Sequence, residues 1–481
     1  MDTSDLPNSQ STSAHDKILP RVKILTMFRL GLFQMGLGIL AVLTLGVLNR
    51  VMIAELKIPA TVTAGILAIA LFTAPMRVVF GQMSDAKPIF GFHRTGYVLI
   101  GAALFTLTLP LSVQVIWQLA SVVQADGGWR WTSQTIGWTA LAALTMTMYG
   151  LASCISSTPF FTLLVDVSDE DNRGQLVGIV WSMMTVGIAV GGITSKVLLR
   201  RLESINASIE VLRSSISWLF IIVPALVLVL AILATLGVEK KYSRYSSRSS
   251  LINREDKITL GNALKILTAS RQTGLFFTFL LVMTISLFMQ EAVLEPYGGE
   301  VFKMSIPQTS LLNTYWGIGM LMSLSATGFF LIPRFGKRKT TEFGCLAVGF
   351  CFLLIILSGF TGNAKLFQST LVLFGLSAGI ATTGALSLML DLTAAETAGT
   401  FVGAWGLSQA MARGTATVTG GIVLDLGRKL FTTPVLAYGL VFALQAVGMV
   451  LAVWLLGRVD VQEFRDNAKE AIASFMEGDL D

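Results

Sequence analysis

The chain has 481 residues, of which 53% are hydrophobic and 13% are charged, and its formal net charge is +6. Soluble domains usually contain about 25% charged residues, so this composition excludes a water-soluble globule. Long apolar runs recur along nearly the whole chain, which predicts a polytopic helical membrane protein. A transmembrane β-barrel is excluded because its strands would alternate between apolar and polar residues. The excess of Lys and Arg is expected to mark cytoplasmic loops, so it does not indicate nucleic-acid binding.

Two further features of the composition concern cysteine and the start of the chain. Cys154, Cys345 and Cys351 all lie in apolar segments, which predicts buried free thiols and neither a disulfide framework nor a metal site. The first 26 residues are polar, and the apolar run after them is too long for the core of a signal peptide. This run is therefore expected to be the first spanning helix.

Twelve spanning helices are predicted, because each crossing needs about 20 residues. In the first half of the chain they are expected at 27–49, 60–83, 96–118, 136–165, 175–199 and 217–238. In the second half they are expected at 273–296, 309–331, 341–362, 366–390, 400–424 and 433–457. The predicted fold is all-α, with two pseudo-symmetric bundles of six transmembrane helices.

This pattern divides the chain into five segments. They are a polar cytoplasmic tail (1–26), a first six-helix bundle (27–238), a basic cytoplasmic linker (239–272), a second six-helix bundle (273–457) and a cytoplasmic tail (458–481). In the last segment the apolar residues recur at helical spacing, which predicts an amphipathic helix.

The basic residues predict how the chain is oriented. The linker holds eight Lys or Arg, which places it in the cytoplasm, and an even number of crossings then places both termini there too. One loop does not fit this orientation, which leaves three basic residues on the outer side: Arg200, Arg201 and Arg213. The orientation is kept because most short loops agree with it.

The two halves carry an internal repeat. FTLLVDVSDEDNRGQLVG (161–178) aligns without gaps on LSLMLDLTAAETAGTFVG (386–403), so that Asp166 falls on Asp391. Ile58-Pro59 likewise matches Ile306-Pro307, each pair just before the second helix of its half. Parallel repeats of six helices are a known plan for transporters.

A charged loop, GQMSDAKPIFGFHRTG, separates the second and third predicted helices. It resembles the pattern G-x-x-x-D-[RK]-x-G-[RK]-[RK] of the major facilitator superfamily, although Ala86 stands where a basic residue is expected. Gly81 is expected to let its helix approach a neighbour closely, and Asp85 to cap a segment or pair with a cation of the other half. Lys87 and Arg94 are expected to hold the loop at the cytoplasmic face. An ordinary positive loop with a turn is the alternative.

Three further stretches narrow the resemblance. LNRVMIAEL (48–56), GFHRTGYV (91–98) and MQEAVLEPYGGEVF (289–302) resemble, in this order, elements of the bacteriochlorophyll-delivery branch of that superfamily, the PucC- and LhaA-like proteins. The resemblance covers roughly residues 25–460.

The resemblance implies a membrane assembly factor for chlorophyll- or bacteriochlorophyll-binding proteins. Such a factor passes pigment to light-harvesting or photosystem polypeptides, or chaperones their assembly. The partners that it implies are the lipid bilayer, these polypeptides and pigment-synthesis enzymes. The implied location is a photosynthetic membrane (thylakoid or intracytoplasmic) or the plasma membrane.

Polar side chains near the outer ends of the first and seventh helices are candidates for a gate or a binding site. Arg50 opposite several carboxylates predicts an ion-pair gate, and the alternative is surface charge at helix ends beside a turn. The candidates are Asn49, Arg50, Glu55, Gln290, Glu291, Glu295, Tyr297 and Glu300.

Three further residues within or at the ends of the spanning helices are candidates, because ionisable groups are costly there and usually functional. Arg413 either lines a cavity and binds an anionic group, or forms an internal salt bridge, or reaches the membrane surface if its helix is shifted. Asp166 and Asp391 are expected to pair with loop arginines and lock the halves together, with proton coupling as the alternative.

Pigment binding can be tested against the available ligands. The two histidines, His15 and His93, lie outside the spanning helices, so a pigment bound there would need oxygen ligands, which Mg²⁺ accepts. The candidates are Gln34, Asn49, Gln290, Asn313, Gln409 and Gln445. This inventory favours chlorophyll or bacteriochlorophyll bound transiently over permanent storage.

No Walker A sequence and no catalytic triad pattern is present, so neither nucleotide-driven pumping nor an enzyme is predicted. Two hypotheses therefore stay open. The first is a factor that delivers pigment and chaperones assembly. The second is a secondary transporter, proton-coupled in one version, that works by alternating access.

Overall fold

The computed structural model describes residues 22–168, 170–202, 209–243, 271–391 and 398–459, and the statements below refer to these ranges. The predicted amphipathic helix in 458–481 therefore lies almost wholly outside the described residues, as do His15 and most of the linker.

The first half of the chain forms helices only. Its first helix continues from α1 through two π-type segments, η1 and η2, without leaving the helical path. The elements are α1 (Ile24–Ala41), η1 (Val42–Leu48), η2 (Val51–Glu55), α2 (Ala60–Phe72), α3 (Met76–Ala86), α4 (Thr95–Ala125), α5 (Ser133–Val167), α6 (Glu170–Leu198), η3 (Arg200–Leu202), α7 (Ile209–Thr235) and α8 (Val238–Tyr242).

The described part of the second half repeats this plan. The elements are α11 (Arg271–Phe288), η4 (Met289–Ala292), α12 (Leu294–Phe302), α13 (Ile306–Ser310), α14 (Leu312–Ala326), η5 (Thr327–Leu331), α15 (Ile332–Phe335), α16 (Lys337–Thr361), α17 (Ala364–Asp391), α18 (Ala398–Leu430) and α19 (Pro434–Gly457).

Within the described ranges, ten helices are long and apolar enough to cross a membrane. The predicted eighth and eleventh spans correspond to α14–η5–α15 and to α18, which pack within the second bundle but are not among these ten. The number of twelve crossings therefore stays a prediction, as does the orientation of the termini.

Two predicted helices are broken in the structure. The helix expected at 60–83 divides into α2 and α3 at Thr73–Pro75, where the proline has no N–H to continue the backbone ladder. The helix expected at 273–296 runs as α11, a 3₁₀ turn and α12, and the break comes just before Pro296. Hydropathy identified both apolar stretches but could not reveal the changes of direction.

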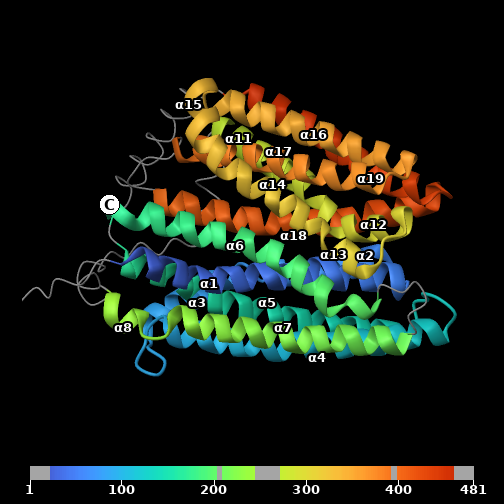
Figure 1. Cartoon of the computed structure of the whole chain (residues 1–481), viewed down its shortest axis with the longest axis horizontal. Helices are drawn as coiled ribbons and strands as arrows, with labels where there is room; N and C mark the ends of the chain where they lie inside the picture. The colour runs from blue at the N-terminus through green and yellow to red at the C-terminus, as the bar shows by residue number, and fades with distance from the viewer. Residues whose placement is uncertain (1–21, 169, 203–208, 244–270, 392–397, 460–481) are drawn as a thin grey trace, which may run out of the picture.

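The pattern of helix packing agrees with the duplication. α4 packs along α5 as α16 packs along α17, and α2 packs on α5 as α14 packs on α17. α1 and α4 both contact α7, and α11 and α16 both contact α19 in the same way. Figure 1 shows the two bundles as two layers of roughly parallel helices, with α6 and α18 between them.

Glycines allow helices within each half to approach closely. A Cβ atom on Gly187 would lie 2.1 Å from the carbonyl oxygen of Met35, where α6 crosses α1. A Cβ atom on Gly375 would lie 2.0 Å from the carbonyl oxygen of Trp316, where α17 crosses α14. Small residues at such crossings let backbones pack tightly in the absence of a hydrophobic driving force.

The bundle has two ends that differ in how the halves meet. We call the end where α1 begins and α8 lies the linker end, and the end that holds η2, α12 and α13 the far end (Figure 1). α2 packs against α18 and α6 against α14, and the close contacts of Gly421 with Ala60 and of Gly192 with Ser310 lie towards the far end. The linker-end continuation of α2, which is α3, packs against α5 of its own half.

Gly375→Ala is expected to lower the midpoint of thermal unfolding in detergent, because the new methyl group overlaps a backbone oxygen and overpacking costs about 1–3 kcal/mol. Gly65→Ala is the matched control, since no heavy atom lies within 4 Å of the position its Cβ would take. Equal midpoints for the two variants would contradict the close crossing of α14 and α17.

Candidate functional site

A buried arginine organises the charged loop at the linker end. The Arg94 side chain is 3% exposed, and it donates to Asp166 at 2.9 Å and to the Ser84 hydroxyl at 2.6 Å. It also pairs with Asp85 at 2.6 Å. Burial of the guanidinium acts to lower its pKa, but the hydrogen bonds and charges of Asp166 and Asp85 outweigh this and raise the pKa. Arg94 therefore stays charged and ties α3, α4 and α5 together.

A carboxylate from α8 completes this network. Glu239 accepts hydrogen bonds from the backbone N–H groups of His93, Arg94 and Thr95, at 2.7, 3.1 and 2.6 Å. These N–H groups open α4 and have no partner within the helix, and a negative charge there is favourable. The start of the predicted linker is therefore fixed to the charged loop.

The other residues predicted for this loop have modest roles. A Cβ atom on Gly81 would lie 3.5 Å from Thr158, an ordinary contact, so the expected close approach is not seen. Lys87 follows α3, is exposed, and its carbonyl oxygen accepts from the Tyr97 hydroxyl.

Asp166 and Asp85 both pair with Arg94, which belongs to the same half as they do. These pairs do not test the predicted lock between the halves, which stays a prediction. The side chain of Asp391 lies outside the described residues.

The surface along which α2 and α6 of the first half pack against α18 and α14 of the second half is called the seam below. At the far end, Arg50 reaches across this seam. Its side chain is buried, and it pairs with Glu55 of its own half at 3.1 Å. It also donates to the carbonyl oxygen of Met304 at 3.1 Å and to the hydroxyl of Thr309 at 3.2 Å, both in the second half. A Cβ atom on Gly299 would lie 2.2 Å from the guanidinium carbon, so only glycine leaves room for it.

Two more groups cross the seam beside Arg50. Asn49 donates to the carbonyl oxygen of Ala292 at 2.9 Å. Asp425 on α18 accepts from the backbone N–H groups of Ala60 and Thr61, at 3.1 and 2.8 Å, and so caps α2 from the other half.

Asp425 was not among the residues predicted from the sequence. A signal existed, because α2 begins after Pro59, which has no side chain that can cap the first N–H groups. The missing cap indicates that an acceptor must come from elsewhere in the fold. It does not indicate which residue supplies it.

The remaining carboxylates of the predicted gate pair within the second half. Glu291 forms a salt bridge with Arg413, whose guanidinium also lies 4.9 Å from the centre of the Phe288 ring. Glu300 pairs with Arg428 at 2.8 Å. Among the hypotheses for Arg413, the structure shows the internal salt bridge, which it forms with Glu291.

Three other predicted residues are buried in or beside this region. Tyr297 lies in the core of the second half, where its hydroxyl donates to the carbonyl oxygen of Ile355 at 2.9 Å. Glu295 accepts from the Asn313 amide, and its other carboxylate oxygen has no partner among the described residues. Gln290 is buried.

These contacts follow one rule in the part of the chain that the structure describes. Each arginine–carboxylate pair lies within one half, whereas the groups that cross the seam bond to neutral partners. The predicted ion-pair gate between Arg50 and the carboxylates of the second half is therefore replaced by hydrogen bonds. Breaking such hydrogen bonds does not leave a buried charge without its partner, which is the costly event in a buried site.

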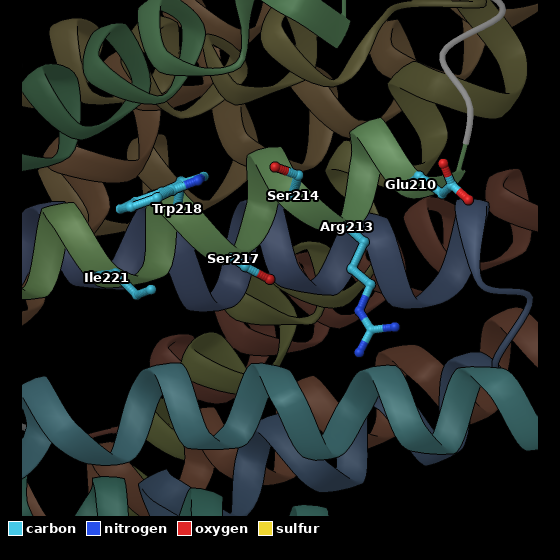
Figure 2. Close-up of a pocket in the computed structure, with 6 residues that line it drawn as sticks. All are labelled: Glu210, Arg213, Ser214, Ser217, Trp218 and Ile221. Atoms are coloured by element: carbon cyan, nitrogen blue, oxygen red, sulfur yellow. The ribbon is translucent and has the colours of Figure 1, made fainter.

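A shallow pocket on α7 lies apart from the seam (Figure 2). Its lining residues include Arg213, which reaches away from the helix, and Trp218, which is exposed. All of them belong to α7, which packs against α1 and α4 of its own half. This pocket is a groove on the outside of the first bundle and has no part in the arrangement at the seam.

The solved structures that this chain matches include several transporters. The chain matches a bacterial homologue of the iron transporter ferroportin in an inward-facing state, with a TM-score of 0.65 and 13% identity, over 92% of this chain and 100% of that one. It matches a D-xylose-proton symporter with a TM-score of 0.63 and 14% identity, over 90% and 97%. The nucleoside transporter NupG gives a TM-score of 0.62 and 14% identity, over 90% and 98%. The fold is therefore that of the major facilitator superfamily.

The family is defined by sequence. The model for the PUCC protein family matches residues 47–464, and the chain belongs to this family. It is 28% identical to the "Bacteriochlorophyll synthase 44.5 kDa chain" of Rhodobacter capsulatus, over 89% of this chain and 94% of that protein. It is 28% identical to the "Uncharacterized protein in puhA-bchM intergenic region" of the same species, over 83% and 80%. It is 26% identical to "Protein PucC" of Cereibacter sphaeroides, over 89% and 90%.

Asp166→Asn is expected to destabilise the protein by about 3 kcal/mol or more, because it leaves the buried Arg94 without its main partner. The measurement is thermal unfolding of the purified protein in detergent. Glu342→Gln is the matched control, because its pair with Arg338 is partly exposed and such pairs contribute about 0–1 kcal/mol. Similar losses for both variants would show that the Arg94 network is not a structural anchor.

Gly299→Ala is expected to displace the Arg50 guanidinium and weaken the far-end contact. The readout is hydrogen exchange at the amides of Ala60 and Thr61, whose acceptor, Asp425, lies across the seam. Exchange at these amides should become about tenfold faster, which corresponds to a loss of about 1.4 kcal/mol in the free energy that holds the far end closed.

The matched control for this experiment is Gly137→Ala, since that α5 glycine is exposed and has open space around it. Unchanged exchange in Gly299→Ala, or an equal increase in the control, would contradict the contact of Arg50 with Gly299.

Proposed function

We propose that this protein is a membrane assembly factor that handles chlorophyll or bacteriochlorophyll and chaperones the assembly of light-harvesting or photosystem proteins. The observation that carries the proposal is the match to the PUCC family along nearly the whole chain. One relative is named for bacteriochlorophyll synthase and others are named PucC.

Exposed apolar side chains on elements towards the linker end support an apolar ligand. At the far end the halves pack closely, whereas these elements expose large apolar side chains. Phe330 on η5 is 73% exposed and Met322 on α14 is 60% exposed, and Met83 on α3 and Trp181 on α6 are nearly half exposed. A flat pigment with a hydrocarbon tail suits such a surface, whereas a sugar or a nucleoside would leave its polar groups unpaired there.

A chlorophyll magnesium needs an axial ligand that the macrocycle can reach, and few side-chain oxygens of the described candidates meet this condition. The side-chain oxygens of Gln34, Asn49 and Gln445 lack partners but are fully enclosed, so a macrocycle does not fit against them. Asn313 donates to Glu295. Gln409 differs, because it is only half-buried and lies on α18, one turn before Arg413.

These features favour a pigment held briefly at the linker-end part of the seam. When bound, the pigment would supply light absorption, and the chain would supply an apolar surface with Gln409 as the oxygen ligand. The salt bridge with Glu291 neutralises Arg413, so this cation is a poor anchor for a pigment carboxylate. Assembly partners of the proposed factor are nascent pigment-binding polypeptides and pigment-synthesis enzymes.

The proposal is tested by purifying the tagged protein in mild detergent and recording its absorption spectrum. The expected result is a substoichiometric chlorophyll-type band together with co-purified antenna or reaction-centre polypeptides. Gln409→Leu should reduce the band several-fold, because leucine cannot ligate the magnesium. Gln118→Leu, at an exposed position on α4, is the matched control and should retain the band.

A clean protein without pigment or partners, isolated from pigmented membranes, would contradict the proposal. Solute uptake by that protein in proteoliposomes would favour the second candidate, a secondary transporter that works with or without proton coupling. The fold shared with transporters favours this candidate, as do the hydrogen bonds by which the described residues of the two halves meet at the far end, because alternating access requires the halves to separate.

A further inference from the structure

A pocket of about 710 Å³ opens at the far end, between the two halves. The first half contributes Lys57 before α2 and Trp129 and Trp131 from the connection between α4 and α5. The second half contributes Asp425 and Lys429 from α18. The pocket lies directly beside the cap that Asp425 provides to α2, and its walls come from both halves.

The charges around the pocket do not balance. The lining holds three cations, Lys57, Arg428 and Lys429, and two carboxylates. Glu300 pairs with Arg428, and Asp425 accepts from the amides of α2 and lies 3.9 Å from Arg428, so the lining keeps a net positive charge. The ammonium groups of Lys57 and Lys429 are exposed, and neither has a carboxylate partner in the described ranges of the chain. The pocket therefore presents two free cations, one from each half, which favours an anionic ligand.

The backbone of Lys57 indicates that its position is specified. Its φ is +55°, in the left-handed region that a residue with a side chain rarely adopts. Glycine or asparagine would relieve this strain, yet a lysine is present. Such strained residues cluster at binding sites, where the surrounding structure holds them in place.

The two tryptophans add an amphipathic wall. The rings of Trp129 and Trp131 meet edge to face, with centroids 5.3 Å apart and planes at 89°. Trp131 is 69% exposed. Exposed indole rings at the end of a transmembrane bundle lie at the level of lipid headgroups, where one side of the ring is apolar and the N–H is wet.

We propose that this pocket binds the headgroup of an anionic phospholipid. The phosphate lies between Lys57 and Lys429, and the acyl chains pass the tryptophans into the bilayer. Because the two lysines belong to different halves, a bound headgroup bridges the seam and stabilises the closed far end. This lipid site does not depend on pigment handling, so the two proposals can fail separately.

The test measures lipid retention by native mass spectrometry of the full-length protein in mild detergent with phosphatidylglycerol. The wild type is expected to retain a bound lipid, and the double variant Lys57→Gln/Lys429→Gln should need about tenfold more lipid for the same occupancy. Lys365→Gln is the matched control, because this exposed lysine lies in the first turn of α17, outside the pocket. The lipid should also raise the thermal midpoint of the wild type and of the control, but not of the double variant.

Two further probes identify the source of the anion. Phosphatidylcholine and inorganic phosphate are each expected to give less than half of the thermal shift of phosphatidylglycerol. An equal shift with inorganic phosphate would overturn the lipid in favour of a free anion, and an equal shift with phosphatidylcholine would overturn the requirement for negative charge. Unchanged retention in the double variant would overturn the site itself. Because both substitutions are at exposed positions, the variant should keep its midpoint without lipid, and a loss of more than a few degrees would count against the assignment.

Discussion

The contact between the halves at the far end depends on which partners the Arg50 guanidinium bonds to in each half. Arg50 keeps its carboxylate partner, Glu55, within the first half and offers its remaining donors to Met304 and Thr309 of the second half. The contact requires a residue without a side chain at position 299, because the guanidinium occupies the space that a Cβ would take. The guanidinium thus keeps the Glu55 carboxylate whether or not the halves touch, whereas its hydrogen bonds to Met304 and Thr309 are lost when the halves part.

The contacts within each half differ in kind from the contacts between the two halves. Inside the first half, Arg94 is buried with Asp166, and loss of either partner would strand a charge. Inside the second half, Glu291 and Arg413 are paired in the same way. Across the seam, hydrogen bonds to backbone groups carry the contact, and each contributes about 0.5–3 kcal/mol net. Two stable bodies joined by a separable contact are what a protein that admits and releases a membrane ligand requires.

Much of the fold could be predicted from the sequence, because apolar runs and the internal repeat are local and regular. The breaks at Pro75 and before Pro296 were missed, since hydropathy averages over the residues that change the direction of the chain. For the site, the sequence predicted that Asn49 and Arg50 lie near the carboxylates of the second half, and the structure brings them together. It could not predict which partner each charge takes, because that depends on rotations of the helices relative to one another. Asp425 was missed for the same reason.

The most direct test of this account is a distance measurement between spin labels at the far end, in nanodiscs. Arg130 lies in the connection between α4 and α5, and Lys365 lies in the first turn of α17, so labels on Arg130→Cys and Lys365→Cys occupy exposed positions of opposite halves. The three native cysteines are buried and should not react. We expect a single narrow distance distribution for the protein with native Arg50, and a second population at a longer distance when Arg50→Gln is added. A broad distribution with Arg50 in place, or no change on adding Arg50→Gln, would contradict this account.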